Sequence, residues 1–178
     1  MIPAARRWWA CAGAALWLSW SMVAWAQPAP REVSPRGLRI GSTVVLEISG
    51  DRLGDNVRLI SSIPIASQQI LAPSSAKKIS IAVTLPNDLL PGIYAFRLAD
   101  SKGVSPPFML GVDRLRQLPF MENLESLPAA LSGVIAGDQK LSVQFPGRRG
   151  EGISVDLETR RLGGAMKPII RLLDANGK

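Results

Sequence analysis

The chain has 178 residues, one cysteine, no histidine and a formal net charge of +7. Without histidine it cannot form a Ser-His-Asp or Cys-His catalytic arrangement, because no imidazole is available to take a proton. Zinc and most transition-metal sites draw on histidine or cysteine, so a lone cysteine leaves no basis for such a site.

The first 26 residues have the layout of a secretory signal peptide. Arg6 and Arg7 precede an apolar run over 8–26, which ends in the small-x-small pattern Ala24-Trp25-Ala26 cut by signal peptidases. The alternative is an uncleaved membrane anchor, since these 19 apolar residues approach the ~20 needed to span a bilayer. Polar, proline-rich sequence from Gln27 favours cleavage. We expect an exported protein that is extracellular, cell-surface or periplasmic, with membrane contact only through an uncleaved signal segment.

Removal of residues 1–26 changes the composition. This segment holds all five tryptophans and Cys11, which lies near the start of the apolar run and not at its end, where a lipidated cysteine belongs. The chain from Gln27 cannot form a disulfide, so its core must stabilise it despite an oxidising destination. Its length suits one medium domain or two small ones.

The remaining charges are scattered. From Gln27 onward 19 Lys and Arg residues stand against 14 acids, which leaves a net charge of +5. Aromatic residues are absent beside the short basic clusters, so solvated faces are favoured over a nucleic-acid surface, and no nucleic-acid partner is expected. Weak attraction to anionic cell-envelope polymers stays open. The clusters are Lys77-Lys78, Arg114/Arg116, Arg148-Arg149 and Arg160-Arg161.

Apolar and polar residues alternate over 43–49, 78–85 and 94–99. This period of two predicts antiparallel strands with one dry and one wet face. Turns rich in Gly, Pro, Asn and Asp separate these stretches, which is typical of a β-sandwich or barrel. The pattern predicts no long helix before residue 112.

From 112 to 128 the alternation stops, and Pro119 interrupts any helix. We expect a connector with one short helical turn that packs against its neighbours. Alternation resumes over 141–145, 153–157 and 167–173, which predicts three further strands.

Residues 174–177, Asp-Ala-Asn-Gly, are typical of a hairpin turn. They are also residue types that could form part of a calcium site, although the turn is the favoured interpretation. No returning strand follows before Lys178, which would leave 167–173 as an uncovered edge. We therefore expect the sequence to be a fragment of a longer protein.

The stretch Ser132–Asp138, the turn Gly147–Gly150 and the proline-led run Lys167–Gly177 resemble the opening half of a bacterial pre-peptidase C-terminal domain, which in that family is a jelly-roll-like β-sandwich. More loosely, residues 33–112 resemble the immunoglobulin-like (TIG-type) modules that precede such domains in exported bacterial proteins. The residues that carry this second resemblance are Ser34–Thr43, Ile48–Gly54 and Leu89–Tyr94.

The resemblance implies an accessory role in export, attachment or substrate binding. Some members of the family bind calcium through acidic residues at the domain start. This chain departs from that pattern, because it has Glu122-Asn123-Leu124-Glu125 where the family has a more acidic run, and Lys140 where a second aspartate often stands. We predict no cofactor, with calcium as an unsupported alternative, and assign no catalytic, cofactor-binding or metal-binding residue.

Two catalytic chemistries remain formally available to the sequence. A Ser-Lys dyad from Ser74, Ser75, Lys77 and Lys78 is formally available, but this is ordinary loop composition before a strand. Glycoside hydrolysis needs two carboxyl groups held roughly 5–10 Å apart. The candidate acids lie on the expected wet faces of strands, where acids belong; they are Glu47, Asp156 and Glu158.

Aromatic platforms for sugars are scarce in the sequence. By alternation Tyr94, Phe96 and Phe145 face the core, where packing is the favoured role. Phe108 and Phe120 flank the connector and are expected to fasten the two modules together.

The sequence predicts an all-β protein in four parts. A signal peptide (1–26) precedes an immunoglobulin-like β-sandwich (31–112), a connector (113–130) and a partial, jelly-roll-like pre-peptidase C-terminal-like domain (131–178). The predicted function is a non-catalytic interaction or spacer module of an exported, cell-surface protein, with an unknown extracellular polymer or protein as partner. The alternative is a fragment of a secreted peptidase or other hydrolase whose catalytic domain lies outside this chain. A self-contained small hydrolase is disfavoured.

Overall fold

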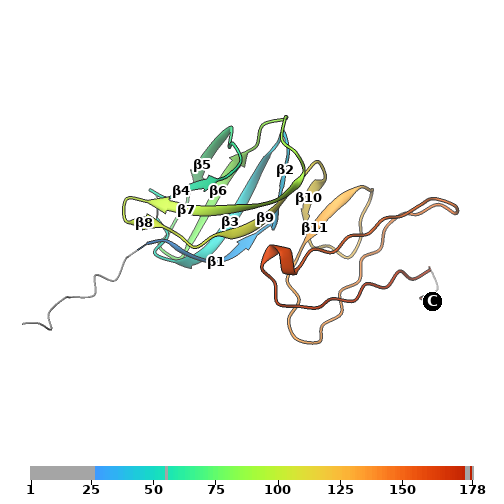
Figure 1. Cartoon of the computed structure of the whole chain (residues 1–178). Helices are drawn as coiled ribbons and strands as arrows, with labels where there is room; N and C mark the ends of the chain where they lie inside the picture. Colours follow the sequence, from blue (N-terminus) through green and yellow to red (C-terminus); the bar gives the residue numbers. More distant parts are fainter. Residues whose placement is uncertain (1–26, 55, 175–176, 178) are drawn as a thin grey trace, which may run out of the picture.

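A computed structural model describes residues 27–54, 56–174 and 177, and in this part the chain is all-β, as predicted (Figure 1). The predicted signal peptide lies outside the described residues. The elements are β1 (Ala29–Ser34), β2 (Gly37–Arg39), β3 (Thr43–Asp51), β4 (Arg58–Ser61), β5 (Ser67–Leu71), β6 (Lys78–Thr84), β7 (Gly92–Asp100), β8 (Gly103–Val104), β9 (Phe108–Asp113), β10 (Arg116–Pro119), β11 (Ala129–Ser132) and a 3-10 turn, η1 (Arg160–Leu162).

One sheet has four antiparallel strands in the order β1-β3-β6-β5. Its central pair follows the predicted alternation, because Leu46 of β3 lies opposite Ile81 of β6, and Ile48 lies opposite Ile79. All four side chains are fully buried. The residues between them point to the other face, which is the half-wet arrangement expected of such a sheet.

The second sheet has the order β2-β9-β7-β4, with β8 paired to the end of β7. β7 and β9 are antiparallel, with Tyr94 opposite Leu110 and Phe96 opposite Phe108. β2 pairs with β9 in parallel. Inward residues of β7 again follow the predicted alternation, since Phe96 and Leu98 are fully buried.

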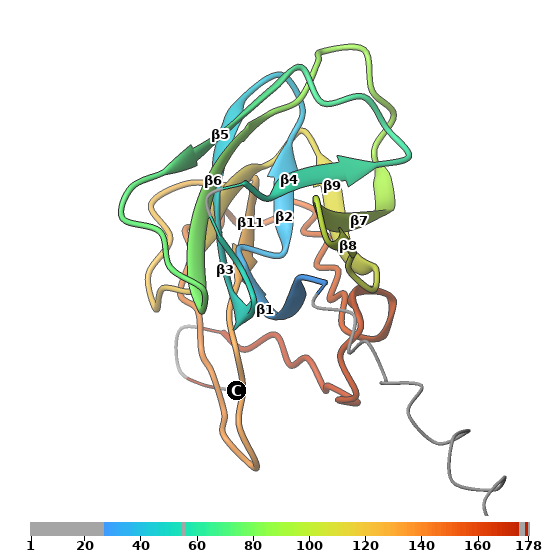
Figure 2. The ribbon, with the colours of Figure 1, turned by 90° about the vertical axis from the view of Figure 1, so that its left-hand side faces the viewer.

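The two sheets pack face to face as a β-sandwich, seen edge-on in Figure 2. Apolar side chains from both sheets fill the space between them, and the rings of Phe96 and Phe108 stack with centroids 6.5 Å apart. Burial of this apolar surface is the main source of stability in a fold without a disulfide. The largest fully buried side chains are Phe96, Leu38, Leu46, Ile48, Leu59, Ile79, Ile81, Leu85, Leu98, Leu110, Val83 and Val112.

The outer strand β1 is irregular. Its pairing with β3 shifts register between Pro30 and Glu32, which is a β-bulge. Gly50 lies opposite Pro30, and a Cβ at Gly50 would lie 2.2 Å from the carbonyl oxygen of Ala29. Only glycine therefore permits this approach of the two strands. Arg31 forms an ion pair with Asp51 on the same edge.

Beyond the sandwich, β10 and β11 form a separate two-stranded parallel sheet, from Arg116 opposite Ala129 to Pro119 opposite Ser132. The expected helical turn in the connector is therefore wrong for this segment. Parallel strands need a crossover between them, and the chain over 120–128 supplies it. Pro119 ends β10, where its missing N–H interrupts no central ladder. The domain division stays a prediction.

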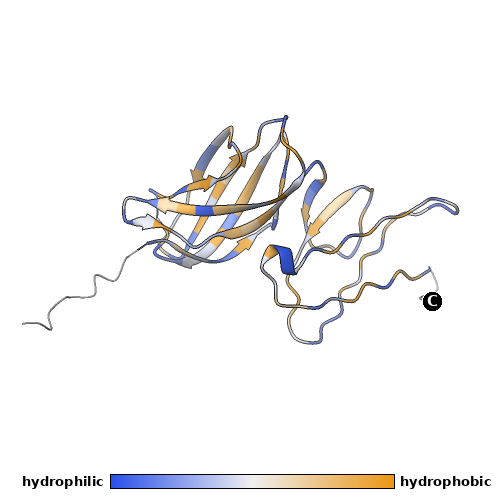
Figure 3. Cartoon of the chain, in the orientation of Figure 1, coloured by the Kyte–Doolittle hydropathy of each residue, from blue (hydrophilic) through white to orange (hydrophobic). Residues whose placement is uncertain are grey.

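The strands expected over 141–145, 153–157 and 167–173 are not formed. After Ser132 the described chain contains only η1 and one bridge, in which Gln144 pairs with Asn123. A strand needs a neighbour for its backbone N–H and C=O groups, and alternation alone supplies none. Hydrophobic residues recur along the backbone of this segment in Figure 3. Its exposed large apolar side chains are Val134, Leu141, Ile153, Val155, Leu157, Ile169, Ile170, Leu172 and Leu173.

Arg36, just before β2, joins the sandwich to the rest of the chain. Its backbone N–H donates to the hydroxyl oxygen of Ser132 in β11 at 3.1 Å. Its guanidinium donates to the carbonyl oxygen of Leu162 in η1 at 3.5 Å. Arg36 therefore links the sandwich by hydrogen bonds to both β11 and η1.

Candidate functional site

An open groove of about 330 Å³ lies beyond the sandwich, between the chain that follows β10 and the chain that follows β11. Two backbone hydrogen bonds hold its walls together: the Gln144 N–H donates to the Glu122 carbonyl at 2.7 Å, and the Leu124 N–H donates to the Gln144 carbonyl at 2.8 Å. The buried side chain of Leu124 anchors one wall. The groove is lined by Phe120, Glu122, Asn123, Lys140, Leu141, Ser142 and Gln144.

Phe120 is the aromatic residue of the groove. Its backbone N–H donates to the Ser132 carbonyl at 2.7 Å, which fixes the residue beside β11. The side chain lies close to Gly133, because a Cβ at Gly133 would be 2.8 Å from Phe120 Cβ and 3.4 Å from Cγ. The absent side chain at Gly133 therefore leaves room for Phe120 against the backbone.

The polar side chains of the groove have no partner among the described residues. No hydrogen bond or ion pair within this part of the chain uses the side chain of Glu122, Asn123, Lys140, Ser142 or Gln144. Together they offer hydrogen-bond donors and acceptors, and one acid is balanced by one base. The groove therefore presents unused hydrogen-bonding groups around one aromatic ring.

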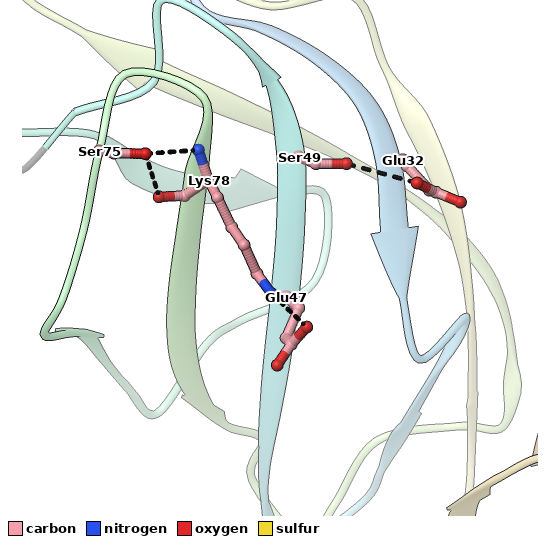
Figure 4. A network of polar contacts seen from close by, with 5 residues as sticks. All are labelled: Glu32, Glu47, Ser49, Ser75 and Lys78. Atoms are coloured by element: carbon pink, nitrogen blue, oxygen red, sulfur yellow. Dashed lines mark hydrogen bonds and ion pairs between the residues drawn. The ribbon is translucent and has the colours of Figure 1, made fainter.

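The outer face of the four-stranded sheet is different, because its polar side chains pair with one another. Lys78 Nζ contacts Glu47 Oε2 at 3.0 Å, and the Ser49 hydroxyl donates to Glu32 Oε2 at 3.4 Å (Figure 4). The hydroxyls of Thr43 and Thr84 share a hydrogen bond of 2.8 Å. This surface leaves fewer unused groups for a ligand.

Within the candidate Ser-Lys dyad, the Ser75 hydroxyl and the Lys78 ammonium have separate partners. Ser75 Oγ accepts from the backbone N–H of Lys78 at 3.0 Å and donates to its carbonyl at 3.2 Å, which shapes the turn before β6 (Figure 4). The Lys78 ammonium points instead to Glu47 and is exposed. The ammonium group of Lys78 is therefore paired with a carboxylate on the neighbouring strand.

The three candidate acids lie on two separate parts of the chain. Glu47 is on β3 with Lys78, and Glu158 forms an ion pair with Arg161. Asp156 is exposed in the segment before η1. Within the described residues, no group of three or more His, Cys, Asp or Glu side chains is placed to hold a metal ion.

Asp113, at the end of β9, is the acid with a clearly shifted pKa. Burial raises the pKa of its carboxyl above the ordinary value, while hydrogen bonds from the Leu115 N–H and the Gln117 side chain act in the opposite direction. Both bonds go to Asp113 Oδ1, at 2.7 and 2.9 Å. The carboxyl therefore fixes the turn between β9 and β10, a structural role.

The remaining sequence candidates lie at the surface. All eight cations of the four basic clusters are exposed, on different elements. The expected turn over 174–177 falls partly outside the described residues; the Gly177 N–H donates to the Asp174 carbonyl at 3.0 Å. No helix in the described part of the chain is long and apolar enough to cross a membrane.

The aromatic residues divide between core and groove. Phe96 is fully buried, and Tyr94 and Phe108 pack against the same core, as alternation predicted for the first two. Tyr94 also donates its hydroxyl proton to the Leu90 carbonyl at 2.9 Å. Phe108 thus belongs to the sandwich. Phe145, expected in a core, is half-buried outside it, and Phe120 lines the groove.

Sequence reasoning missed the groove residues Ser142 and Gln144, and it treated Asn123 and Lys140 only as departures from a calcium-binding pattern. Each is an ordinary polar residue in its local sequence, with no motif around it. Their proximity arises from the Asn123–Gln144 bridge, which joins segments on either side of β11. A local pattern cannot reveal such a non-local contact.

Comparison with known protein families gives no match, and no curated protein matches the chain. Among solved structures, it is similar to SGBP-B of the Bacteroides ovatus mixed-linkage glucan utilization locus, solved in complex with a mixed-linkage heptasaccharide, with a TM-score of 0.41 and 20% identity. The match covers 55% of this chain and 25% of that one, so the chain spans about a quarter of its length. This likeness is too weak to assign a ligand or a function.

Proposed function

We propose that the chain is a non-catalytic interaction or spacer module of an exported, cell-surface bacterial protein. The observation that carries this proposal is a contrast between two parts of the chain. The sandwich encloses an apolar core, whereas the segment that follows it leaves large apolar side chains exposed. Among the described residues, nine of the thirteen exposed large apolar side chains lie in the range Val134 to Leu173. Large exposed apolar patches on soluble proteins mark interaction sites, so this segment is the proposed contact surface.

The sandwich serves as the rigid support in this proposal. Its core is apolar, and no buried side-chain N or O atom in the described part lacks a hydrogen-bond partner. Binding residues are commonly carried by irregular segments that a rigid scaffold positions. The groove and the exposed apolar residues fit this arrangement, because both lie outside the two large sheets.

The proposal also includes export, an accessory role and a class of partner. Export rests on the signal peptide predicted over 1–26, and the accessory role rests on the resemblances to an immunoglobulin-like module and a pre-peptidase C-terminal domain. The proposed partner is an extracellular polymer or protein, bound without a cofactor. Exposed cations such as Arg148 and Arg149 add weak attraction to anionic envelope polymers.

The test is retention of the chain from Gln27 on bacterial cell-envelope polymers. Purified peptidoglycan and insoluble envelope polysaccharides are sedimented with the protein, and the bound fraction is measured. We expect retention that falls when Val155, which is 56% exposed, is changed to Ser together with Ile153 and Leu157. The matched control is Val45→Ser on the sandwich, where Val45 is 45% exposed.

Failure to be retained by any of these polymers would contradict the proposed binding role. Equal loss in the Val45→Ser control would mean that general surface hydrophobicity, and not the segment after Ser132, causes retention. A parallel assay with casein and with dye-linked polysaccharides tests the non-catalytic part. Hydrolysis that survives repurification would overturn it.

A further inference from the structure

We infer that the groove lined by Phe120, Asn123 and Gln144 binds a neutral polysaccharide chain. The inference rests on the proposed binding role and names the ligand class for one surface. It is drawn from the unpaired donors and acceptors that surround a single aromatic ring in an open groove. Its volume of about 330 Å³ is near the lower end of small-molecule sites, which suits a short stretch of a sugar chain.

The hydrogen-bonding groups match sugar hydroxyls. A sugar hydroxyl both donates and accepts, and so do the carboxamides of Asn123 and Gln144 and the hydroxyl of Ser142. A purely cationic lining would only donate hydrogen bonds to a sugar hydroxyl, and a purely anionic lining would only accept them. The groove offers both donors and acceptors on adjacent side chains, which lie on the two walls joined by the Asn123–Gln144 bridge.

Phe120 supplies the apolar contact that a sugar ring needs. One face of a pyranose carries mostly C–H groups, and this face packs on an aromatic ring. The backbone bond from Phe120 to Ser132 and the close approach to Gly133 position the side chain before any ligand arrives. Aromatic side chains bury a large area with few rotatable bonds, so little conformational entropy is lost on binding.

The charge of the groove favours a neutral ligand. Glu122 and Lys140 cancel one another, so the lining has no net charge to attract phosphates or uronic acids. Binding of single-stranded nucleic acid needs a positively charged groove and several aromatic platforms. This groove has a carboxylate and one aromatic residue, which disfavours nucleic acid.

The backbone of the site is preorganised. The bonds from the Gln144 N–H to Glu122 and from the Leu124 N–H to Gln144 fix the two walls, and buried Leu124 holds one of them in place. Binding then costs less backbone entropy at Glu122, Leu124 and Gln144, where these hydrogen bonds already hold the main chain. A weak but specific affinity for soluble oligosaccharides is the expected result.

The test uses isotope-labelled chain from Gln27 and a panel of neutral soluble probes: cellohexaose, mannohexaose and chitohexaose. Amide spectra are recorded during titration, because the predicted mature chain has no tryptophan to report by fluorescence. With at least one probe, we expect shifts of the side-chain amide signals of Asn123 and Gln144 and of the backbone near Phe120. Signals from β3 and β6 should stay in place.

Three variants sharpen the test. Phe120→Ala should weaken binding about tenfold, whereas Phe120→Trp should retain it because the ring remains. Gln144→Ala should weaken binding about three- to tenfold. The matched control is Gln69→Ala, an exposed glutamine on β5, which should leave binding unchanged.

Several outcomes would overturn the inference: no shift with any neutral probe at millimolar concentration, shifts confined to the sandwich, or full binding by both Phe120→Ala and Gln144→Ala. Shifts at the groove with oligothymidylate alone would assign it to nucleic acid instead. Retention on envelope polymers that both groove variants keep would leave the proposed binding role standing while this groove is ruled out. Normal amide dispersion of each variant excludes unfolding as the cause.

Discussion

The sandwich over 29–113 and the segment over 133–174 share an alternation of apolar residues but differ in structure. In β3 and β6 the alternating side chains meet those of the opposite sheet and are fully buried. In 153–157 and 167–173 the same kind of side chain stays exposed, and the backbone has no ladder partner in the described part of the chain.

The difference shows that alternation specifies the two faces of a strand without specifying its neighbours. Each strand of the sandwich has at least one partner within the chain, and each inner face has an opposing sheet. The later segment lacks both among the described residues. Its large apolar side chains therefore lie at the surface of the described chain.

The largest expected effect is a direct test of this contrast. Phe96→Ala removes a fully buried ring that stacks on Phe108, and it should lower the free energy of unfolding by about 3–5 kcal/mol. Val155→Ala should change it by less than about 0.5 kcal/mol. Urea denaturation followed by circular dichroism measures both. Comparable losses from the two substitutions would mean that the later segment is packed as tightly as the sandwich.

A smaller effect is expected at the edge of the sandwich. Gly50→Ala places a Cβ against the Ala29 carbonyl oxygen, and the displaced backbone should cost about 1–3 kcal/mol of stability. Gly54→Ala is the matched control, since no described atom lies within 4 Å of its Cβ position. If thermal melting shows the two variants to be equally stable, the register of β1 on β3 is not as tightly fixed as the structure indicates.

The stability of the fold should depend on pH through Asp113, which lies at the end of β9 where the sandwich ends. Because burial raises the pKa of this carboxyl in the folded state, its ionised form destabilises the fold at neutral pH, and the cost disappears as the pH falls through the folded-state pKa. Asp113→Asn keeps an acceptor for Leu115 and Gln117. We expect a melting temperature at pH 7 that is equal or a few degrees higher, and a smaller gain on acidification.

Melting curves from pH 7 to pH 4 check this prediction, with Asp113→Ala as the control that removes the acceptor. A lower melting temperature for Asp113→Asn than for the native chain at neutral pH, with an unchanged pH dependence, would show that the charge itself stabilises the turn.

The smallest effect is expected on the paired outer face. Lys78 and Glu47 are 61% and 58% exposed, and exposed ion pairs contribute less than about 1 kcal/mol. A double-mutant cycle with Lys78→Met and Glu47→Gln measures the coupling. A coupling above about 2 kcal/mol would be too strong for a solvated pair. It would mean that surface charge, and not core burial alone, stabilises the sandwich relative to the later segment.

Local patterns predicted the strands that have partners. The alternation over 43–49, 78–85 and 94–99 corresponds to β3, β6 and β7, because each central strand shows its buried face directly in the sequence. The short strands β10 and β11 carried no such signal, since their parallel pairing depends on the crossover between them. The groove was not predicted for the same reason, because Asn123 and Gln144 belong to segments on either side of β11 that only a non-local contact joins.

The bulged outer strand has a consequence for self-association of the chain. Exposed sheet edges can recruit a strand from a neighbouring molecule and so start fibre growth. On β1 this growth is blocked, because Pro30 has no N–H to extend a ladder, the register shift after it twists the edge, and the Arg31–Asp51 pair places charge along it. This edge of the sandwich therefore disfavours strand pairing between copies of the chain.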